Sequence, residues 1–218
     1  MDDVTADQQQ PGAEDGAEDS GGDGRSWSAA FAATQLFKER GFDKVTIADI
    51  ASAAGVAKMT VTNYFPLKED LVLDMGEEHV TTLTRAVGQR EPGESALAAL
   101  RRDYLERVRR RDPLIPDDDI AWQRLVRDTP ALRARLRQIH EQAEHALVAV
   151  LADETGDAGI TTTLAAAQLA AVDRLLFYEG QRLVLEGRTS DEIFAILADT
   201  ADRAFGLLEP ALGGYARR

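Results

Sequence analysis

The side chains with the most specific chemistry in this chain lie in one short stretch, residues 58–64, KMTVTNY. They combine one cation, short hydroxyl and amide groups and a flexible apolar tip: Lys58, Met59, Thr60, Thr62 and Asn63. Such groups donate hydrogen bonds to phosphates and base edges, and an apolar tip contacts the methyl group of thymine. On a helix they would share a face suited to a DNA major groove.

Residues 46–65 supply two short helices to position that face. Thr46, with Asp49 three residues later, is typical of a capping box at the start of the first helix. Gly55 follows where this helix must end, since glycine adopts the left-handed conformation at little cost. The apolar residues of the first helix recur at helical spacing: Ile47, Ile50, Ala51 and Ala54.

The second helix is expected to begin near Ala57 and to pack through one side. A small Ala51, the turn at Gly55 and a branched Val61 favour the steep crossing of a helix-turn-helix. Tyr64 and Phe65 fall on the same side as Val61. The alternative is a small helical hairpin with a polar outer face inside an ordinary all-α core.

The flanking segments extend this pattern to about residues 26–72. LFKERGFDKVT (36–46) comes before it and NYFPLKEDL (63–71) after it. Together they resemble the DNA-binding domain of the Tet-repressor family of bacterial transcription regulators. The matching residues are Leu36, Phe37, Gly41, Phe42, Thr46, Asp49, Ile50, Ala51, Ala54, Gly55, Val56, Tyr64, Phe65, Lys68, Glu69 and Leu71.

The resemblance implies a mechanism. A small molecule in a C-terminal helical domain shifts the fourth helix and releases DNA, and the last two helices form the dimer contact. It also implies that Lys68 contacts a phosphate, a role we expect for Thr46 and Tyr64 too, whereas Lys58, Met59, Thr60 and Thr62 read bases. The predicted DNA-binding residues are Thr46, Lys58, Met59, Thr60, Thr62, Asn63, Tyr64 and Lys68.

Charge is unevenly distributed along the chain, whose net charge is −13. Residues 1–24 carry eight acidic residues and no basic one, so we expect a disordered acidic leader. Residues 25–70 carry six basic and five acidic residues and are the only part without net negative charge. DNA affinity depends on where cations lie relative to phosphates, so a dimer of such domains is needed for tight binding.

The composition excludes several classes of protein. There is no cysteine among the 218 residues, which excludes disulfides, thiolate catalysis and cysteine-based zinc sites. No signal peptide or membrane-spanning run is recognisable, so the predicted location is the cytoplasm, with no membrane partner. The chain has no nucleotide-binding or nucleophile motif, and we expect neither an enzyme nor a cofactor.

Helical spacing continues to the end of the chain, and no strand-like alternation persists. The first helix is predicted over residues 27–40 and the fourth over 67–89. The remaining helices are predicted at 94–111, 118–128, 131–154, 161–186 and 191–208. The last two carry apolar stripes wide enough for a partner as well as their own core, so we expect them to form the homodimer interface.

The candidate ligand-binding residues of this region are aromatic: Tyr104, Trp122, Phe177 and Tyr178. His140 and His145 are five positions apart, about 140° around a helix, so they diverge and we expect no metal site.

The sequence therefore predicts an all-α protein of about nine helices in three parts. These are the leader (1–24), a three-helix helix-turn-helix DNA-binding domain (25–66) and a helical ligand-binding and dimerisation domain (67–210). The predicted function is a ligand-responsive transcription regulator, a repressor. It binds a pseudo-palindromic double-stranded DNA operator as a homodimer and is released by a small-molecule effector of unknown identity.

The alternative is an all-α dimeric small-molecule-binding protein with weak or lost DNA binding. Its basis is the low positive charge and the start of the first helix. Ser26, Ser28 and Ala29 stand there, where the family usually has basic residues and a branched aliphatic.

Overall fold

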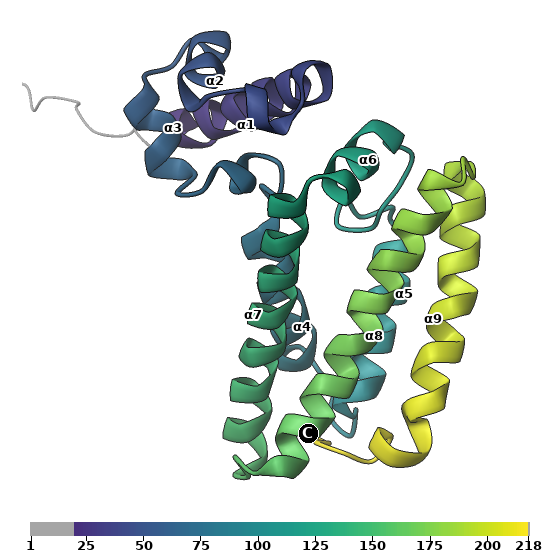
Figure 1. Cartoon of the computed structure of the whole chain (residues 1–218). Helices are drawn as coiled ribbons and strands as arrows, with labels where there is room; N and C mark the ends of the chain where they lie inside the picture. The colour runs from purple at the N-terminus through teal and green to yellow at the C-terminus, as the bar shows by residue number, and fades with distance from the viewer. Residues whose placement is uncertain (1–19, 218) are drawn as a thin grey trace, which may run out of the picture.

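The computed structural model describes residues 20–217, and this part of the chain is entirely helical (Figure 1). The predicted all-α fold is confirmed. The predicted leader lies outside the described residues as far as position 19. The elements are α1 (Ser20–Arg40), the 3₁₀ turn η1 (Phe42–Lys44), α2 (Ile47–Ala54), α3 (Lys58–Tyr64), the 3₁₀ turn η2 (Lys68–Leu71), α4 (Gly76–Gly88), α5 (Ala96–Arg109), α6 (Ile120–Asp128), α7 (Pro130–Thr155), α8 (Ile160–Leu185) and α9 (Ser190–Leu212).

The helix-turn-helix of α2 and α3 has the local structure that its sequence predicts. The Thr46 hydroxyl accepts from the Asp49 N–H at 3.2 Å, and the Thr46 N–H donates to the Asp49 carboxylate at 2.8 Å. Gly55 is left-handed, with φ 67° and ψ 29°. Ala51 and Val61 are buried where the two helices meet. These features fix the angle at which α3 leaves the domain.

Two helix ends differ from the prediction. α1 begins at Ser20 instead of Trp27. Apolar residues at helical spacing start only at Trp27, so this spacing could not predict that the helix also includes the glycine-rich residues before it. α9 continues past residue 208 to Leu212, which is buried in the core of the bundle.

The predicted helix over 67–89 is wrong in its first part. Lys68–Leu71 is a 3₁₀ turn, residues 72–75 form an irregular connector, and α4 starts at Gly76. Leu71, Val72 and Leu73 are 0, 2 and 7% exposed. Three consecutive buried side chains cannot face one side of an α-helix, because each step turns by about 100°. At Gly76 a Cβ atom would lie 3.0 Å from Cδ1 of Ile139 in α7, so the chain passes very close to that helix.

Below the N-terminal domain, the long helices α4, α5, α7, α8 and α9 form an elongated bundle, and the short α6 lies across its upper end (Figure 1). α8 is long and apolar enough to cross a membrane by length and composition alone. It packs against α5, α6, α7 and α9, and buried side chains such as Leu169 and Leu176 belong to the bundle core. Its apolar character is that of a central core helix.

The core of the N-terminal domain continues into the bundle. Phe37, Val61 and Leu71 belong to the same buried cluster as Val126 of α6 and Leu132 of α7. The lower bundle has a separate core. The orientation of the N-terminal domain therefore depends on α6 and on the first half of α7.

Candidate DNA-binding surface and ligand cavity

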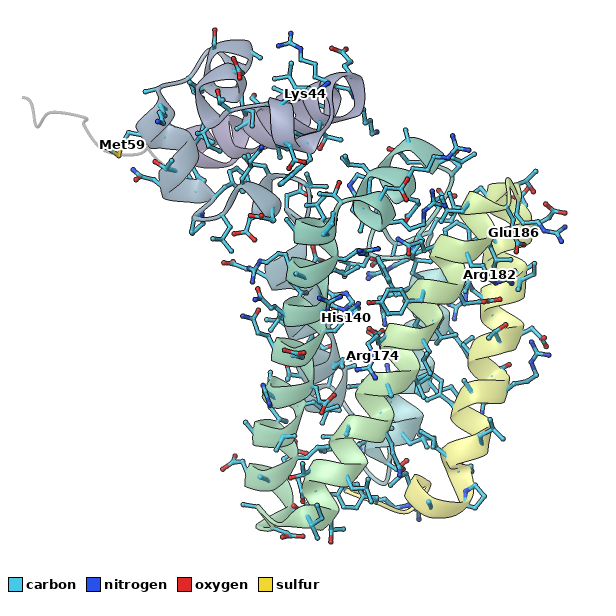
Figure 2. The ribbon with its side chains drawn as sticks, in the orientation of Figure 1. Lys44, Met59, His140, Arg174, Arg182 and Glu186 are labelled. Atoms are coloured by element: carbon cyan, nitrogen blue, oxygen red, sulfur yellow. The ribbon has the colours of Figure 1, made fainter. Side chains whose placement is uncertain are left out.

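The outer face of α3 presents five of the eight predicted DNA-binding residues to solvent. Lys58, Met59, Thr62, Asn63 and Tyr64 are exposed, whereas Val61 is 1% exposed and anchors the helix from behind. Figure 2 shows Met59 at the outer end of the N-terminal domain, pointing away from the bundle. An exposed short helix held by one buried residue is the arrangement that enters a major groove.

The three threonines among the predicted contacts, Thr46, Thr60 and Thr62, are less free than the others, because each is partly buried or hydrogen-bonded within the domain. Thr60 is half-buried. The Thr46 hydroxyl donates to the Asp49 carboxylate at 2.6 Å, and together with the Thr46 N–H it holds the pKa of that carboxyl below its ordinary value. Thr62 donates back to the Met59 carbonyl at 3.1 Å. The Thr46 side chain is thus used to cap α2, and its predicted phosphate contact stays a prediction.

Lys68 is turned into the N-terminal domain. Its ammonium donates to the Phe42 carbonyl at 2.5 Å and lies 4.3 Å from the centre of the Phe42 ring and 5.4 Å from that of Phe37. This geometry combines a charge-assisted hydrogen bond with cation–π contacts. In this conformation Lys68 joins η2 to the end of α1.

Two exposed cations of this domain were not among the predicted contacts. Arg40 and Lys44 are exposed, and neither forms an ion pair with a side chain of residues 28–217 (Lys44 is labelled in Figure 2). Arg40 lies at the end of α1 and Lys44 lies in η1, whereas most of the predicted DNA contacts come from the face of α3. With Lys58 they are the exposed basic groups among residues 28–66.

A cavity of about 460 Å³ lies where the N-terminal domain meets the bundle, and we call it the junction cavity. Its wall consists of the connector, the start of α4, the loop between α5 and α6, and the facing sides of α6, α7 and α8. Trp122 and Phe177 line it as candidate ligand contacts, whereas Tyr104 and Tyr178 do not. The volume is within the range of small-molecule sites.

The two tyrosines have other surroundings. Tyr104 is 3% exposed, and burial raises the pKa of its phenol. The Tyr178 ring packs against the rings of Phe177 and His140, 5.8 and 5.7 Å away between centres. All four residues are predicted from their aromatic type alone. Only the side of its helix on which each residue lies decides whether it lines the cavity, and the sequence does not give that orientation.

Beside the junction cavity, a row of buried polar groups crosses the bundle. His79 lines the cavity. Its Nε2 atom lies 3.1 Å from Nδ1 of His140 and 3.5 Å from the Asp173 carboxylate. Arg107 donates to Asp173 at 2.9 Å and to Asp103 at 2.9 Å. The row connects α4, α5, α7 and α8, and His140 lies between α7 and α8 (Figure 2).

The imidazoles of this row are held neutral. Burial lowers the pKa of His79, and burial together with His79 lowers the pKa of His140 to about 4. Burial alone would raise the pKa of Asp173, but the Arg107 guanidinium lowers it below its ordinary value. Nε2 of His140 is buried without a hydrogen-bond partner in the described structure.

The two histidines considered for a metal lie on different faces of α7. His140 is buried, and His145 is exposed. Among the described side chains, no three or more histidine, aspartate or glutamate residues are arranged to hold a metal ion.

Three polar contacts tie the upper bundle to the N-terminal domain and its connector. Lys38 of α1 pairs with Asp119 at 2.5 Å, the Trp122 indole donates to the Val72 carbonyl at 3.2 Å, and Arg135 donates to Asp70 at 2.7 Å. Asp119, Trp122 and Val72 all line the junction cavity. A molecule in this cavity would therefore touch the groups that position the domain.

Comparison with known proteins identifies the N-terminal domain. Residues 32–75 match the sequence model of bacterial regulatory proteins, tetR family. No curated protein matches the chain.

Several solved structures share the fold over most of the chain. A Mesorhizobium loti protein described as a TetR-family transcriptional regulator is 18% identical, with a TM-score of 0.54, and the match covers 88% of this chain and 98% of that one. A TetR-family regulator of Streptomyces coelicolor A3 is 22% identical, with a TM-score of 0.50 and coverage of 88% and 99%. The complex of SmeT with triclosan is 17% identical, with a TM-score of 0.51 and coverage of 83% and 90%.

These comparisons agree with the geometry. The family sequence model runs from within α1 through α2 and α3 to the end of the connector, and the likeness of fold extends through the bundle. Regulators of this family are generally non-enzymatic DNA-binding proteins. Residues 32–75 therefore form a helix-turn-helix domain of the tetR family of bacterial regulatory proteins, and the chain shares its overall fold with TetR-family regulators.

Proposed function

We propose that this protein is a cytoplasmic repressor that binds a pseudo-palindromic operator as a homodimer and is released by a small molecule. The observation that carries the proposal is the exposed face of α3, supported by buried Val61 in a TetR-family domain. Lys58, Met59, Thr60 and Thr62 are the proposed base-reading residues. Thr46, Tyr64 and Lys68 are proposed to contact phosphates, Asn63 completes the surface, and Arg40 and Lys44 add positive charge.

The proposed dimer forms through α8 and α9, which pack side by side along one flank of the bundle (Figure 1). Leu175 of α8 and Leu207 of α9 are 63 and 82% exposed. They line a mainly apolar groove between the two helices, together with Ala171 and Ala204. Pairing this surface with its copy would form an isologous four-helix interface and bury the exposed leucines.

The proposed effector site is the junction cavity. An effector releases DNA only if it binds the DNA-incompetent orientation of the N-terminal domain more tightly than the competent one. The cavity wall supports such a difference, because Val72, Asp119 and Trp122 both line it and hold the domain or its connector. The similar structure of SmeT contains triclosan.

Footprinting tests this function directly. The full-length protein is applied to DNA flanking its own coding region over a series of salt concentrations. We expect protection of a short pseudo-palindrome with a steep salt dependence, since phosphate contacts release counterions. The variant combining Lys58→Ala and Asn63→Ala should lose protection, while Arg109→Ala, which removes an exposed cation of the bundle, should not.

The second candidate function is a dimeric small-molecule-binding protein without operator binding. It is favoured by the internal contacts of Lys68 and Thr46, which engage one predicted phosphate-binding cation and one predicted phosphate-binding hydroxyl within the protein itself. A folded dimer that protects no DNA at low salt would support this candidate and contradict the repressor.

A further inference from the structure

The inner wall of the junction cavity is apolar and aromatic. Leu114, Ile115, Leu136, Ile139 and Phe177 line it together with the Trp122 ring. Such a wall favours a ligand with a substantial hydrophobic body, because burying that body removes apolar surface from water.

The charged side chains of the lining are mostly acidic. The connector contributes Asp74, and the loop between α5 and α6 contributes four carboxylates: Asp112, Asp117, Asp118 and Asp119. Arg111 is the only arginine or lysine of the lining, and its guanidinium binds Ser190 and Asp191 at the start of α9. His79 adds no charge near neutral pH, because burial lowers its pKa.

Two of these carboxylates already have partners. Asp112 accepts from the Leu114 N–H at 2.9 Å and pairs with Arg110. Asp119 caps α6 by accepting from the Trp122 N–H at 2.9 Å, and it pairs with Lys38.

Asp117 differs from both, because its Oδ1 atom is buried and no described group donates a hydrogen bond to it. Asp117 as a whole is half-buried and lines the cavity, and its carboxylate forms no ion pair with the described residues, so a ligand that carries a positive charge and an N–H donor can pair with it there.

We propose that the junction cavity binds an amphiphilic amine, whose apolar body lies against Trp122 and Phe177 and whose protonated amino group donates to Asp117. The proposal names the effector class of the repressor proposed above, and its biological role rests on that function. An N–H donor matters, because the unpaired group is an acceptor. Asp117 lies two positions before Asp119 in the chain, and in this proposal the ammonium group also competes with Lys38 for the Asp119 carboxylate. This competition would link ligand binding to the orientation of α1.

The test uses three probes of equal chain length with the full-length protein: decylammonium, decanol and decanoate, each below its micelle-forming concentration. Affinity is measured by calorimetry at pH 7.5, and circular dichroism confirms that the protein stays folded. We expect decylammonium to bind about tenfold more tightly than decanol, the gain of one charge-assisted hydrogen bond, and decanoate to bind most weakly. Decyltrimethylammonium, which has the charge but no N–H, should lose most of this advantage.

Matched variants locate the amino group. Asp117→Asn should remove the preference for decylammonium over decanol and leave decanol binding unchanged. Asp128→Asn, an equal charge change at the exposed end of α6, should leave the preference intact. Decanol binding as tightly as decylammonium, or a preference that survives Asp117→Asn, would overturn the proposal. If Asp117→Asn fails to fold, the wild-type probe series decides alone.

An operator-release assay separates this inference from the proposed function. Selective amine binding without operator release supports the ligand class and contradicts the repressor mechanism. Release of a footprinted operator by decanol or decanoate, but not by decylammonium, supports the repressor and overturns the amine proposal.

Discussion

Among single residues, Lys68 is the one whose surroundings bear most directly on DNA binding. Its ammonium lies against Phe42 and Phe37 inside the N-terminal domain, with one hydrogen bond to a carbonyl. A side chain in this position stabilises the domain and can still add positive potential to the surface. Its contributions to stability and to binding are separable, because only a phosphate contact changes the salt dependence.

We expect Lys68→Ala to lower the free energy of unfolding by about 1–2 kcal/mol through loss of these contacts. We also expect it to weaken binding to all operators alike and to reduce the salt slope by about 1, as for a phosphate contact. Met59→Ala, at a side chain that is 69% exposed, should instead leave stability within about 0.5 kcal/mol and change the ranking of operators. Denaturant titration measures the stability of each variant, and binding to a series of operators measures its affinity and preference. If the two variants behaved alike, the assignment of Lys68 to phosphate contact and of Met59 to base reading would be wrong.

His140 makes stability depend on pH. Its pKa falls from 6.5 to about 4 because of burial and of His79, with Asp173 and Arg174 also facing the ring. Because the pKa of His140 is lower in the folded protein, the unfolded chain binds this proton at a higher pH than the folded protein does. The stability that neutral His140 contributes is therefore fully present above pH 6.5 and is lost as the pH falls toward 4. His140→Leu should therefore flatten the fall in unfolding free energy over this window by roughly 2–3 kcal/mol. Equal slopes for wild type and variant, measured by urea denaturation at several pH values, would contradict it.

Among the helices and their connections, the elements predicted correctly are those whose signals are local. The Thr46 cap, the Gly55 turn and the spacing around Val61 define α2 and α3 without knowledge of the rest of the chain. The connector is different, because its shape depends on burying Val72 and Leu73 against partners in distant helices.

The ligand cavity shows the same limit. Aromatic type selected Trp122 and Phe177, which line the cavity, but it also selected Tyr104 and Tyr178, which do not. Which side of a helix faces a cavity depends on how α5, α6 and α8 are rotated against one another. Asp117 lies in a loop without periodicity, so nothing in its sequence surroundings marks it.

The wall of the cavity also depends on a close approach of α8 to the loop between α5 and α6. A Cβ atom at Gly180 would lie 3.1–3.2 Å from three atoms of the Pro116 ring. We expect Gly180→Ala to displace Pro116 and the adjacent Asp117, and to weaken decylammonium binding several-fold, even though alanine favours the helix by up to about 1 kcal/mol. Gly88→Ala, with no neighbour within 4 Å of the added Cβ, is the control and should bind normally. If Gly180→Ala bound decylammonium as tightly as the wild type, the loop would accommodate the added methyl group without disturbing the ligand site, and this prediction would be wrong.

For the proposed dimer, the decisive quantities are the distance and the angle between its two N-terminal domains. Each domain shares a core with α6 and α7 and is tied to the bundle through Asp119 and Arg135. It therefore turns with the upper bundle, and the bundle in turn is positioned by the proposed α8–α9 interface. Two recognition helices reach successive major grooves of one DNA face only if they lie about 34 Å apart.

In the proposed dimer, operator binding would depend on two leucines far from the DNA, Leu175 and Leu207. Combining Leu175→Glu with Leu207→Glu should convert the dimer to a monomer, because four buried carboxylates would face one another across the two-fold axis. Helical content should remain, since both side chains are exposed in the single chain. Operator affinity should fall by at least about a hundredfold, since each domain then binds without the other. Ile160→Glu, an 80% exposed position on α8 outside the groove, should keep both dimer and affinity. Sedimentation and anisotropy titrations measure the two properties, and a double variant that stays dimeric would place the interface elsewhere on the molecule.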